Sequence, residues 1–181
     1  MIKSPLVEQL KNLNLISVPG LALDLGCGDG GDSIALAEVG LNVVAIDKRT
    51  EEIVERKGDL TISVVTSDIR DFKIEKEKYN LIIAKNVLPF LGSKEESYQT
   101  IRSISEGLLP GGSMYLTLFG PKDAWAMEKS NMNFIDYDEA VSFLNSLGLI
   151  SIHRLTEEGL GPLKSGGIKY WHIHRFLYKK P

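Results

Sequence analysis

Four glycines within six positions directly follow a short apolar stretch near the start of the chain. The sequence of residues 22–31 is A-L-D-L-G-C-G-D-G-G, with glycine at positions 26, 28, 30 and 31. This pattern predicts a short buried strand that ends in a loop. Because glycine has no side chain and adopts positive φ freely, a ligand can lie against the bare backbone there. We expect a helix over residues 34–39, capped by Asp32 or Ser33, to present its N-terminus to that ligand.

The glycine spacing fits two classes of cofactor. Three of the glycines satisfy G-x-G-x-x-G, and Asp47 lies sixteen positions after the last of them, near the pattern of dinucleotide-binding proteins. The acids favour S-adenosylmethionine instead, because Asp24 lies in the first strand, Asp47 closes the second and Asp68 follows the third. A nicotinamide cofactor and a glycine turn without a ligand are the alternatives.

The run D-L-G-C-G-D-G resembles the first motif of the class I S-adenosylmethionine-dependent methyltransferases. The resemblance continues in order over about residues 21–120, including L-P-G-G before the fifth expected strand, and is looser toward the C-terminus. It implies a Rossmann-like α/β fold with a seven-stranded, mostly parallel sheet and helices on both faces. The last strand is then antiparallel and lies between the fifth and the sixth. The implied enzyme transfers the methyl group of S-adenosylmethionine and releases S-adenosylhomocysteine.

Residues at the strand ends are the candidate cofactor ligands. A carboxylate at Asp47 can accept hydrogen bonds from both ribose hydroxyls, although it could instead cap a helix over residues 50–57. The resemblance places the adenine at Asp68 and Ile69, with Asp71 as an alternative acid, and the methionine portion after the fourth strand. The candidate cofactor-binding residues are Asp24, Gly26, Cys27, Gly28, Gly30, Asp47, Lys48, Asp68, Ile69, Lys85 and Asn86.

The segment after the fourth strand limits the classes of methyl acceptor that are expected. Asn86 is followed by Val87 and Leu88, whereas methyltransferases of this fold that act on DNA bases or protein amides carry Asn-Pro-Pro-Tyr there. Lys85 and Asn86 supply no carboxylate cluster, so we expect no metal. Cys27 is the only cysteine and belongs to the glycine loop, which argues against a cysteine nucleophile.

Length and composition predict one domain of 181 residues. Within it we expect an N-terminal helix or cover (1–19), a cofactor-binding core (20–120) and substrate-side loops with the C-terminal strands (121–181). A net charge of −3 makes nucleic acid an unlikely partner, and a small-molecule acceptor fits better. One cysteine, no leader and no long apolar run predict a cytoplasmic protein without a membrane span, either a monomer or a homodimer.

Hydrophobic periodicity and turn residues place the remaining elements. An N-terminal helix, with Ser4 as its cap and Pro5 at its first position, either covers the cofactor or packs on the sheet. Further helices are expected over residues 94–108 and 137–147. Strands are expected over residues 41–46, 61–65, 79–84, 113–119, 149–155 and 168–179, with loops over 121–132 and 157–167.

The last strand begins at the ligand edge of the sheet. His172 and Tyr170 are the candidate catalytic residues, and His153 is a further possible base; a structural role for His172 and His174 is the alternative. The two histidines lack a third obvious ligand, so a metal site is not expected. The loop over 121–132 either closes over the substrate or is a surface connection anchored by its tryptophan. The candidate substrate-contacting residues are Phe90, Phe119, Trp125 and Trp171.

Two segments resemble the tellurite-resistance type of methyltransferase: N-V-L-P-F-L at residues 86–91, and the ending from E-E-G-L-G-P to Y-W-H-I-H-R-F. Relatives of this type act on soft nucleophiles, which implies a thiol, a chalcogen oxyanion such as tellurite or selenite, or another small metabolite. Asp32 departs from the pattern, because a basic residue there would suit the methionine carboxylate better. The alternative functions are an NAD(P)-dependent oxidoreductase and a non-catalytic S-adenosylmethionine-binding module.

Overall fold

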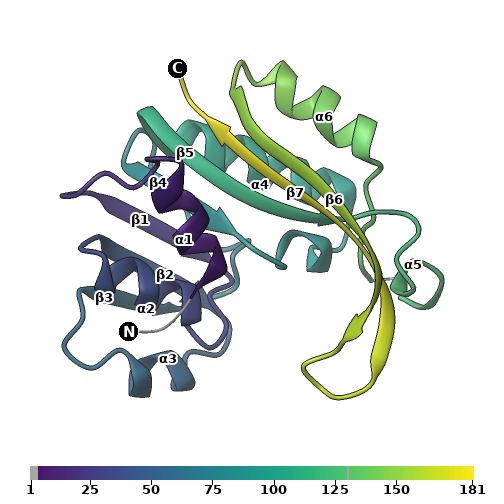
Figure 1. Cartoon of the computed structure of the whole chain (residues 1–181), viewed down its shortest axis with the longest axis horizontal. Coiled ribbons are helices and arrows are strands. Elements are labelled where there is room, and N and C mark those ends of the chain that lie inside the picture. The colour runs from purple at the N-terminus through teal and green to yellow at the C-terminus, as the bar shows by residue number, and fades with distance from the viewer. Residues whose placement is uncertain (1–3, 130) are drawn as a thin grey trace.

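The structure is a computed structural model that describes residues 4–129 and 131–181. In these residues seven strands form one sheet in the order β3-β2-β1-β4-β5-β7-β6 (Figure 1). The strands are β1 (Leu21–Leu25), β2 (Asn42–Asp47), β3 (Ile62–Thr66), β4 (Tyr79–Ala84), β5 (Leu108–Phe119), β6 (Ile150–Pro162) and β7 (Ile168–Lys179). The helices are α1 (Pro5–Asn12), α2 (Gly31–Glu38), α3 (Glu51–Arg56), α4 (Lys94–Gly107), α5 (Trp125–Glu128) and α6 (Tyr137–Ser146), with a 3₁₀ turn η1 (Leu88–Phe90).

Strand direction sets the edge at which a site can form. The pairs β3–β2, β2–β1, β1–β4 and β4–β5 are parallel, whereas β7 is antiparallel to both β5 and β6. The predicted fold class, with the reversed last strand between the fifth and sixth, is confirmed. The carboxyl ends of β1 to β5 therefore meet at one edge, where ligands bind in open α/β sheets.

Apolar side chains alternate between the two faces of the sheet because successive strand residues point in opposite directions. Leu23 and Leu25 of β1 belong to the core under α4 and α6. Ala22 belongs to the core under α1 and α2. Asp24 consequently points toward α2, which is where its partner in the site lies.

The N-terminal helix packs on the sheet. The predicted cap is confirmed, because the Val7 backbone N–H donates to the Ser4 hydroxyl at 3.1 Å and Pro5 occupies the first turn. Leu6 and Leu10 are buried in the same core as α2, so α1 crosses the face of the sheet (Figure 1). This agrees with the predicted role of packing on the sheet, the alternative to covering the cofactor.

Two strands begin or end differently from the prediction. β5 begins at Leu108 instead of residue 113, because Leu108 pairs with Tyr79 and the Pro-Gly-Gly segment forms an irregularity within the ladder. β6 continues to Pro162, so most of the predicted loop over 157–167 is strand paired with β7. Glycine is required in this strand at Gly161, where a Cβ would lie 2.9 Å from the Trp171 ring. Gly161 therefore marks a close approach to the neighbouring strand, and only residues 163–167 of the predicted loop connect the two strands.

Candidate active site

A cavity of about 400 Å³ lies at the carboxyl ends of the parallel strands. It is bounded by the glycine loop after β1, the end of β2, the segment after β3 and the turn after β4. Six predicted cofactor-binding residues line it: Gly26, Asp47, Lys48, Asp68, Ile69 and Asn86. The other five, Asp24, Cys27, Gly28, Gly30 and Lys85, lie around the loop without lining this cavity.

Glycine is required at three positions of the loop for different structural reasons. A Cβ on Gly26 would lie 2.5 Å from Val87, and a Cβ on Gly30 would lie 2.4 Å from Ile53. Packing therefore excludes side chains at both positions. At Gly28 a Cβ would meet nothing within 4 Å, but φ is 55°, a left-handed backbone that favours glycine. Of these three glycines, only Gly28 faces open space with bare backbone.

The predicted caps of the helix after the loop are wrong. The helix α2 begins already at Gly31, and its N-cap is Gly30, which makes no side-chain cap hydrogen bond. Ser33 instead donates to Asp24 at 2.6 Å, and both side chains are buried. Asp32 is held from outside the helix, as described below. The helix starts where the flexible Gly30–Gly31 backbone allows it, which frees both side chains for long-range contacts.

Burial changes the titration of two groups beside the loop. Desolvation raises the pKa of Asp24 to about 7, opposed by its hydrogen bond with Ser33. Desolvation, together with the Asp24 charge, raises the pKa of Cys27 to about 12. The Cys27 thiol is therefore protonated at neutral pH and is not a nucleophile.

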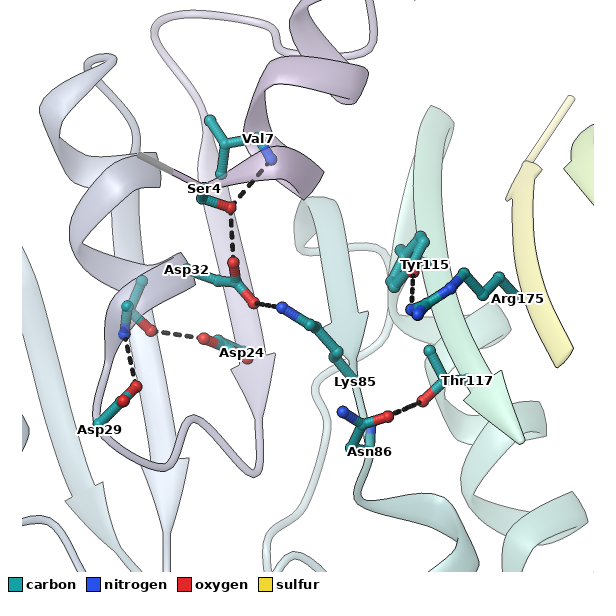
Figure 2. A network of polar contacts seen from close by, with 12 residues as sticks. Ser4, Val7, Asp24, Asp29, Asp32, Lys85, Asn86, Tyr115, Thr117 and Arg175 are labelled. Carbon is teal, nitrogen blue, oxygen red and sulfur yellow. Dashed lines mark hydrogen bonds and ion pairs between the residues drawn. The ribbon is translucent and has the colours of Figure 1, made fainter. Parts of the chain in front are cut away.

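A polar chain connects α1 to the end of β4 (Figure 2). Ser4 donates to one carboxylate oxygen of Asp32 at 2.6 Å, and Lys85 pairs with the other at 2.8 Å. From its charge alone, Asp32 is unsuited to contact the methionine carboxylate of the cofactor. In the structure Lys85 neutralises Asp32, and its side chain lines a cavity between α1 and the C-terminal strands.

Asp47 is fixed by backbone donors. Gly28 N–H donates to one carboxylate oxygen at 3.0 Å, and Arg49 N–H donates to the other at 3.1 Å. The helix α3 is preceded by Thr50, so Asp47 does not cap it. A carboxylate has about four acceptor positions, so two remain for a ligand in the cavity.

Asp68 lies between two cations. Arg70 contacts it with Nη2 at 2.6 Å and with Nε, and Lys48 Nζ lies 2.8 Å away. The hydrogen bond from Arg70 holds the pKa of Asp68 well below its usual range, so the carboxylate is ionised. The predicted alternative, Asp71, does not line the cavity.

Asn86 has a strained backbone at the end of β4. Its φ is 55°, which non-glycine residues adopt rarely. Thr117 stabilises this conformation, because its hydroxyl accepts the Asn86 backbone N–H at 2.6 Å and donates to the side-chain oxygen at 3.0 Å (Figure 2). Such strain concentrates at functional sites, where surrounding contacts maintain it.

The four predicted substrate-contacting residues form one aromatic cluster. Phe90 lies 6.2 Å from both Phe119 and Trp125, and Trp171 lies 5.6 Å from both of these, measured between ring centroids. Phe90 also lines the cofactor cavity. The cluster therefore adjoins that cavity on the side of β5 and β7.

A buried lysine lies inside this cluster. The Lys169 ammonium is 3.9 Å from the Trp171 ring centroid and 4.0 Å from that of Trp125, and it pairs with Asp123. The two side chains are 5% and 0% exposed. Burial lowers the pKa of Lys169, and the bond to Asp123 opposes this shift. The pair joins the segment before α5 to the start of β7.

Two of the three candidate bases, His172 and Tyr170, are held by protein partners. His172 is buried, its Nδ1 accepts the Lys122 backbone N–H at 3.1 Å, and its Nε2 lies 3.4 Å from Glu158. Tyr170 donates its hydroxyl to Glu158 at 3.1 Å. His153 lines a different cavity, between α1 and the C-terminal strands. This geometry agrees with the structural alternative for His172, and its catalytic role stays a prediction.

His174 is also held by the protein. Its Nδ1 lies 2.8 Å from the Thr156 hydroxyl, and burial lowers its pKa to about 4. In residues 4–129 and 131–181, no group of three or more His, Cys, Asp and Glu side chains is placed to hold a metal ion. In the same part of the chain, no helix is long and apolar enough to cross a bilayer.

Comparison with known proteins identifies the family. The model of the family "Tellurite resistance protein TehB" matches residues 4–120, which is more than half of the chain. The chain belongs to the TehB family. TehB of Haemophilus influenzae superposes with a TM-score of 0.75 at 22% identity, over 96% of this chain and 62% of that protein. The predicted resemblance to tellurite-resistance methyltransferases is thereby confirmed.

Two other similar proteins carry methyltransferase names. The cypemycin N-terminal methyltransferase of Streptomyces sp is 34% identical over 104 residues, which is 56% of this chain and 42% of that protein. The N-methyltransferase NodS of Bradyrhizobium japonicum, solved with S-adenosylhomocysteine, has a TM-score of 0.70 at 19% identity, over 96% of this chain and 85% of that one. The TehB-family chain spans about half the length of the curated relatives it matches. The names of these two proteins agree with the expected enzyme class, and the product bound to NodS agrees with the expected cofactor.

Sequence reasoning missed several residues around the TehB-family site. Thr117, Asp123 and Arg70 contact its residues, and neither Thr117 nor Asp123 belongs to a recognisable local motif. Asp123 and Lys169 are 46 positions apart, and Lys85 and Asp32 are 53 apart. Only Arg70 has a sequence signal, because it lies two positions after the predicted acid Asp68.

Proposed function

We propose that this protein transfers the methyl group of S-adenosylmethionine to a small-molecule nucleophile. The observation that carries the proposal is the cavity itself. One continuous space of about 400 Å³ is lined by the loop glycine Gly26, by Asp47 after β2, by Asp68 and Ile69 after β3 and by Asn86 after β4. These are the strand ends at which the sequence predicts the methionine, ribose and adenine contacts.

The residues of the cavity fit this cofactor. Asp47 has free acceptor positions for ribose hydroxyls, and Ile69 supplies an apolar surface for a flat ring. Asp68 can accept from an exocyclic amine, although Arg70 and Lys48 already occupy part of its hydrogen-bonding capacity. Lys85 does not line this cavity, and its ammonium pairs with Asp32 at 2.8 Å. When bound, S-adenosylmethionine supplies a methyl group on a positively charged sulfur that is a good leaving group.

The contribution of the protein is alignment and exclusion of water. A sulfonium methyl is already activated, so holding two reactants in line accounts for the largest effect, about 7–11 kcal/mol when the geometry is good. The Asn86 turn is held by Thr117, and both Asn86 and Phe90 of the aromatic cluster line the cavity. We assign the substrate side to that cluster, namely Phe90, Phe119, Trp125 and Trp171.

The test is methyl transfer by the purified protein. Labelled S-adenosylmethionine is incubated with a panel of thiols, selenite, tellurite, phenols and amines, and S-adenosylhomocysteine is quantified by mass spectrometry. The proposal predicts acceptor-dependent product with at least one member. Binding of S-adenosylhomocysteine without transfer to any acceptor would favour the non-catalytic binding module instead.

A further inference from the structure

The carboxylate of Asp68, at the adenine end of the cofactor cavity, already accepts several hydrogen bonds. The backbone N–H and the guanidinium Nε of Arg70 donate to Oδ1 at 3.0 and 3.1 Å. The guanidinium Nη2 donates to Oδ2 at 2.6 Å, and Lys48 Nζ lies 2.8 Å from the same oxygen. Because a carboxylate offers about four acceptor positions, Asp68 has little capacity left for a further donor. A ligand amine therefore binds there when one of these donors leaves.

Lys48 is the donor that leaves most easily. It makes one contact with Asp68, whereas Arg70 makes several from a position two residues along the same segment. The Lys48 side chain is 64% exposed, and that of Asp68 is 15% exposed. An exposed ammonium is well solvated and such ion pairs stabilise proteins little, so Lys48 exchanges Asp68 for water at low cost.

The Lys48 side chain also crosses the space that a nucleoside base needs. Lys48 directly follows Asp47, the acid that we assign to the ribose, and its ammonium reaches Asp68, the acid that we assign to the adenine. All three residues line the cofactor cavity. Because the base is joined to the ribose, a bound nucleoside that contacts both acids has its base between them. The lysine and the base therefore compete for one part of the cavity.

We propose that Lys48 competes with the cofactor for Asp68, and that the exocyclic amine of the adenine binds by displacing the Lys48 ammonium. This inference rests on the proposed function, because it concerns the cofactor of the same transfer. It gives Lys48, which the sequence predicts as a cofactor-binding residue, the role of setting the affinity and the base selectivity of the cavity. The displaced ammonium moves into solvent, while the hydrocarbon stem of Lys48 stays beside the base.

The exchange depends on the group at position 6 of the base. The amine of adenine donates to Asp68 and replaces the bond that Lys48 gives up. Hypoxanthine carries a carbonyl oxygen at that position, which accepts hydrogen bonds and cannot replace a donor at a carboxylate. With this base Lys48 stays on Asp68, and its ammonium has further N–H groups to donate to the carbonyl. Removal of the ammonium should therefore favour adenine and not hypoxanthine.

The experiment measures the affinities of S-adenosylhomocysteine and of S-inosylhomocysteine, its deaminated analogue, by calorimetry. Lys48→Met keeps a long, unbranched side chain and removes the charge. We expect this variant to bind S-adenosylhomocysteine about 3- to 5-fold more tightly than the wild type, and S-inosylhomocysteine no more tightly. Arg49→Met is the matched control, because it removes an equal charge from the same cavity wall and keeps the backbone N–H that holds Asp47. It should change both affinities by less than about 2-fold.

Salt gives a second readout of the same competition. Screening weakens the exposed contact between Lys48 and Asp68, so the tighter binding by Lys48→Met should fall below about 2-fold when the ionic strength rises from about 20 mM to about 500 mM. Unchanged or weaker binding of S-adenosylhomocysteine by Lys48→Met, equal tightening of both ligands, or a gain that salt does not reduce would overturn the inference. Failure of the wild-type protein to bind S-adenosylhomocysteine would overturn the proposed function instead.

Discussion

Lys164, in the turn between β6 and β7, contacts Asp29 in the glycine loop at 3.3 Å across 135 positions of sequence. The contact ties the far end of the hairpin to the loop that borders the cofactor cavity. Asp29 is also held from the other side, because Arg56 donates to its backbone oxygen at 2.6 Å. The turn of the hairpin and the glycine loop therefore contact each other.

Removal of this contact should affect ligand exchange more than stability. Lys164 is largely exposed, and exposed ion pairs contribute about 0–1 kcal/mol, so Lys164→Ala should leave the unfolding temperature unchanged within about 2 °C. We expect S-adenosylhomocysteine to dissociate up to about 5-fold faster, as measured by stopped-flow fluorescence. Lys179→Ala, at the opposite end of β7, is the control. Identical dissociation rates for both variants would show that the contact does not retain the ligand.

The raised pKa of Asp24 predicts that the stability of the protein depends on pH. Burial raises its pKa to about 7 in the folded protein, above the ordinary value of 3.8 that applies when unfolded. The folded state therefore binds the proton more tightly, and the contribution of Asp24 to stability falls as the pH rises from about 4 to about 7. The variant Asp24→Asn has no carboxyl group at this position, so it lacks this loss of stability with rising pH.

The variant should gain stability relative to the wild type across that window, by up to about 4 kcal/mol, and the difference should be constant above pH 8. Urea denaturation of both proteins between pH 5 and pH 8.5 measures it. A difference that does not change with pH would contradict the assigned titration.

The buried pair of Lys169 and Asp123 predicts a large effect of removing one charge. Lys169→Met leaves the Asp123 carboxylate buried without its cation, which typically destabilises a protein by about 3–5 kcal/mol. The double variant Lys169→Met with Asp123→Asn should recover a large part of that loss. Denaturant unfolding gives the free energies, and the emission of Trp125 and Trp171 should shift because both rings face the ammonium. A single variant as stable as the wild type would contradict the predicted cost.

Variants of Asp68 and Asp71 distinguish between the two carboxylates that could contact the adenine. Asp68 lines the cavity, whereas Asp71 does not. Asp68→Asn should weaken S-adenosylhomocysteine by about 1–2 kcal/mol, and Asp71→Asn should leave its affinity unchanged. Equilibrium titration of both variants decides between them. The reverse ranking would transfer the contact to Asp71.

Strand ends were predictable, and long-range contacts were not. Asp47, Asp68 and Asn86 follow apolar strands, and the parallel sheet brings such positions to one edge, so sequence alone places them together. The cluster of Phe90, Phe119, Trp125 and Trp171 follows from the same rule for β5 and the reversed β7.

Other features depend on packing that no local pattern encodes. Asp32 on α2 pairs with Lys85, which directly follows β4. Gly161 indicates a loop until its close approach to Trp171 is known. Ser33 has the residue type of a helix cap, yet buried Asp24 provides a stronger partner for its hydroxyl.

Calorimetric titration of S-adenosylhomocysteine into the folded protein tests the central claim most directly. The account predicts saturable binding at one site per chain, and a loss of about 1.5–3 kcal/mol in Asp47→Ala that exposed Asp59→Ala does not show. No heat and no thermal shift with the wild-type protein would contradict it.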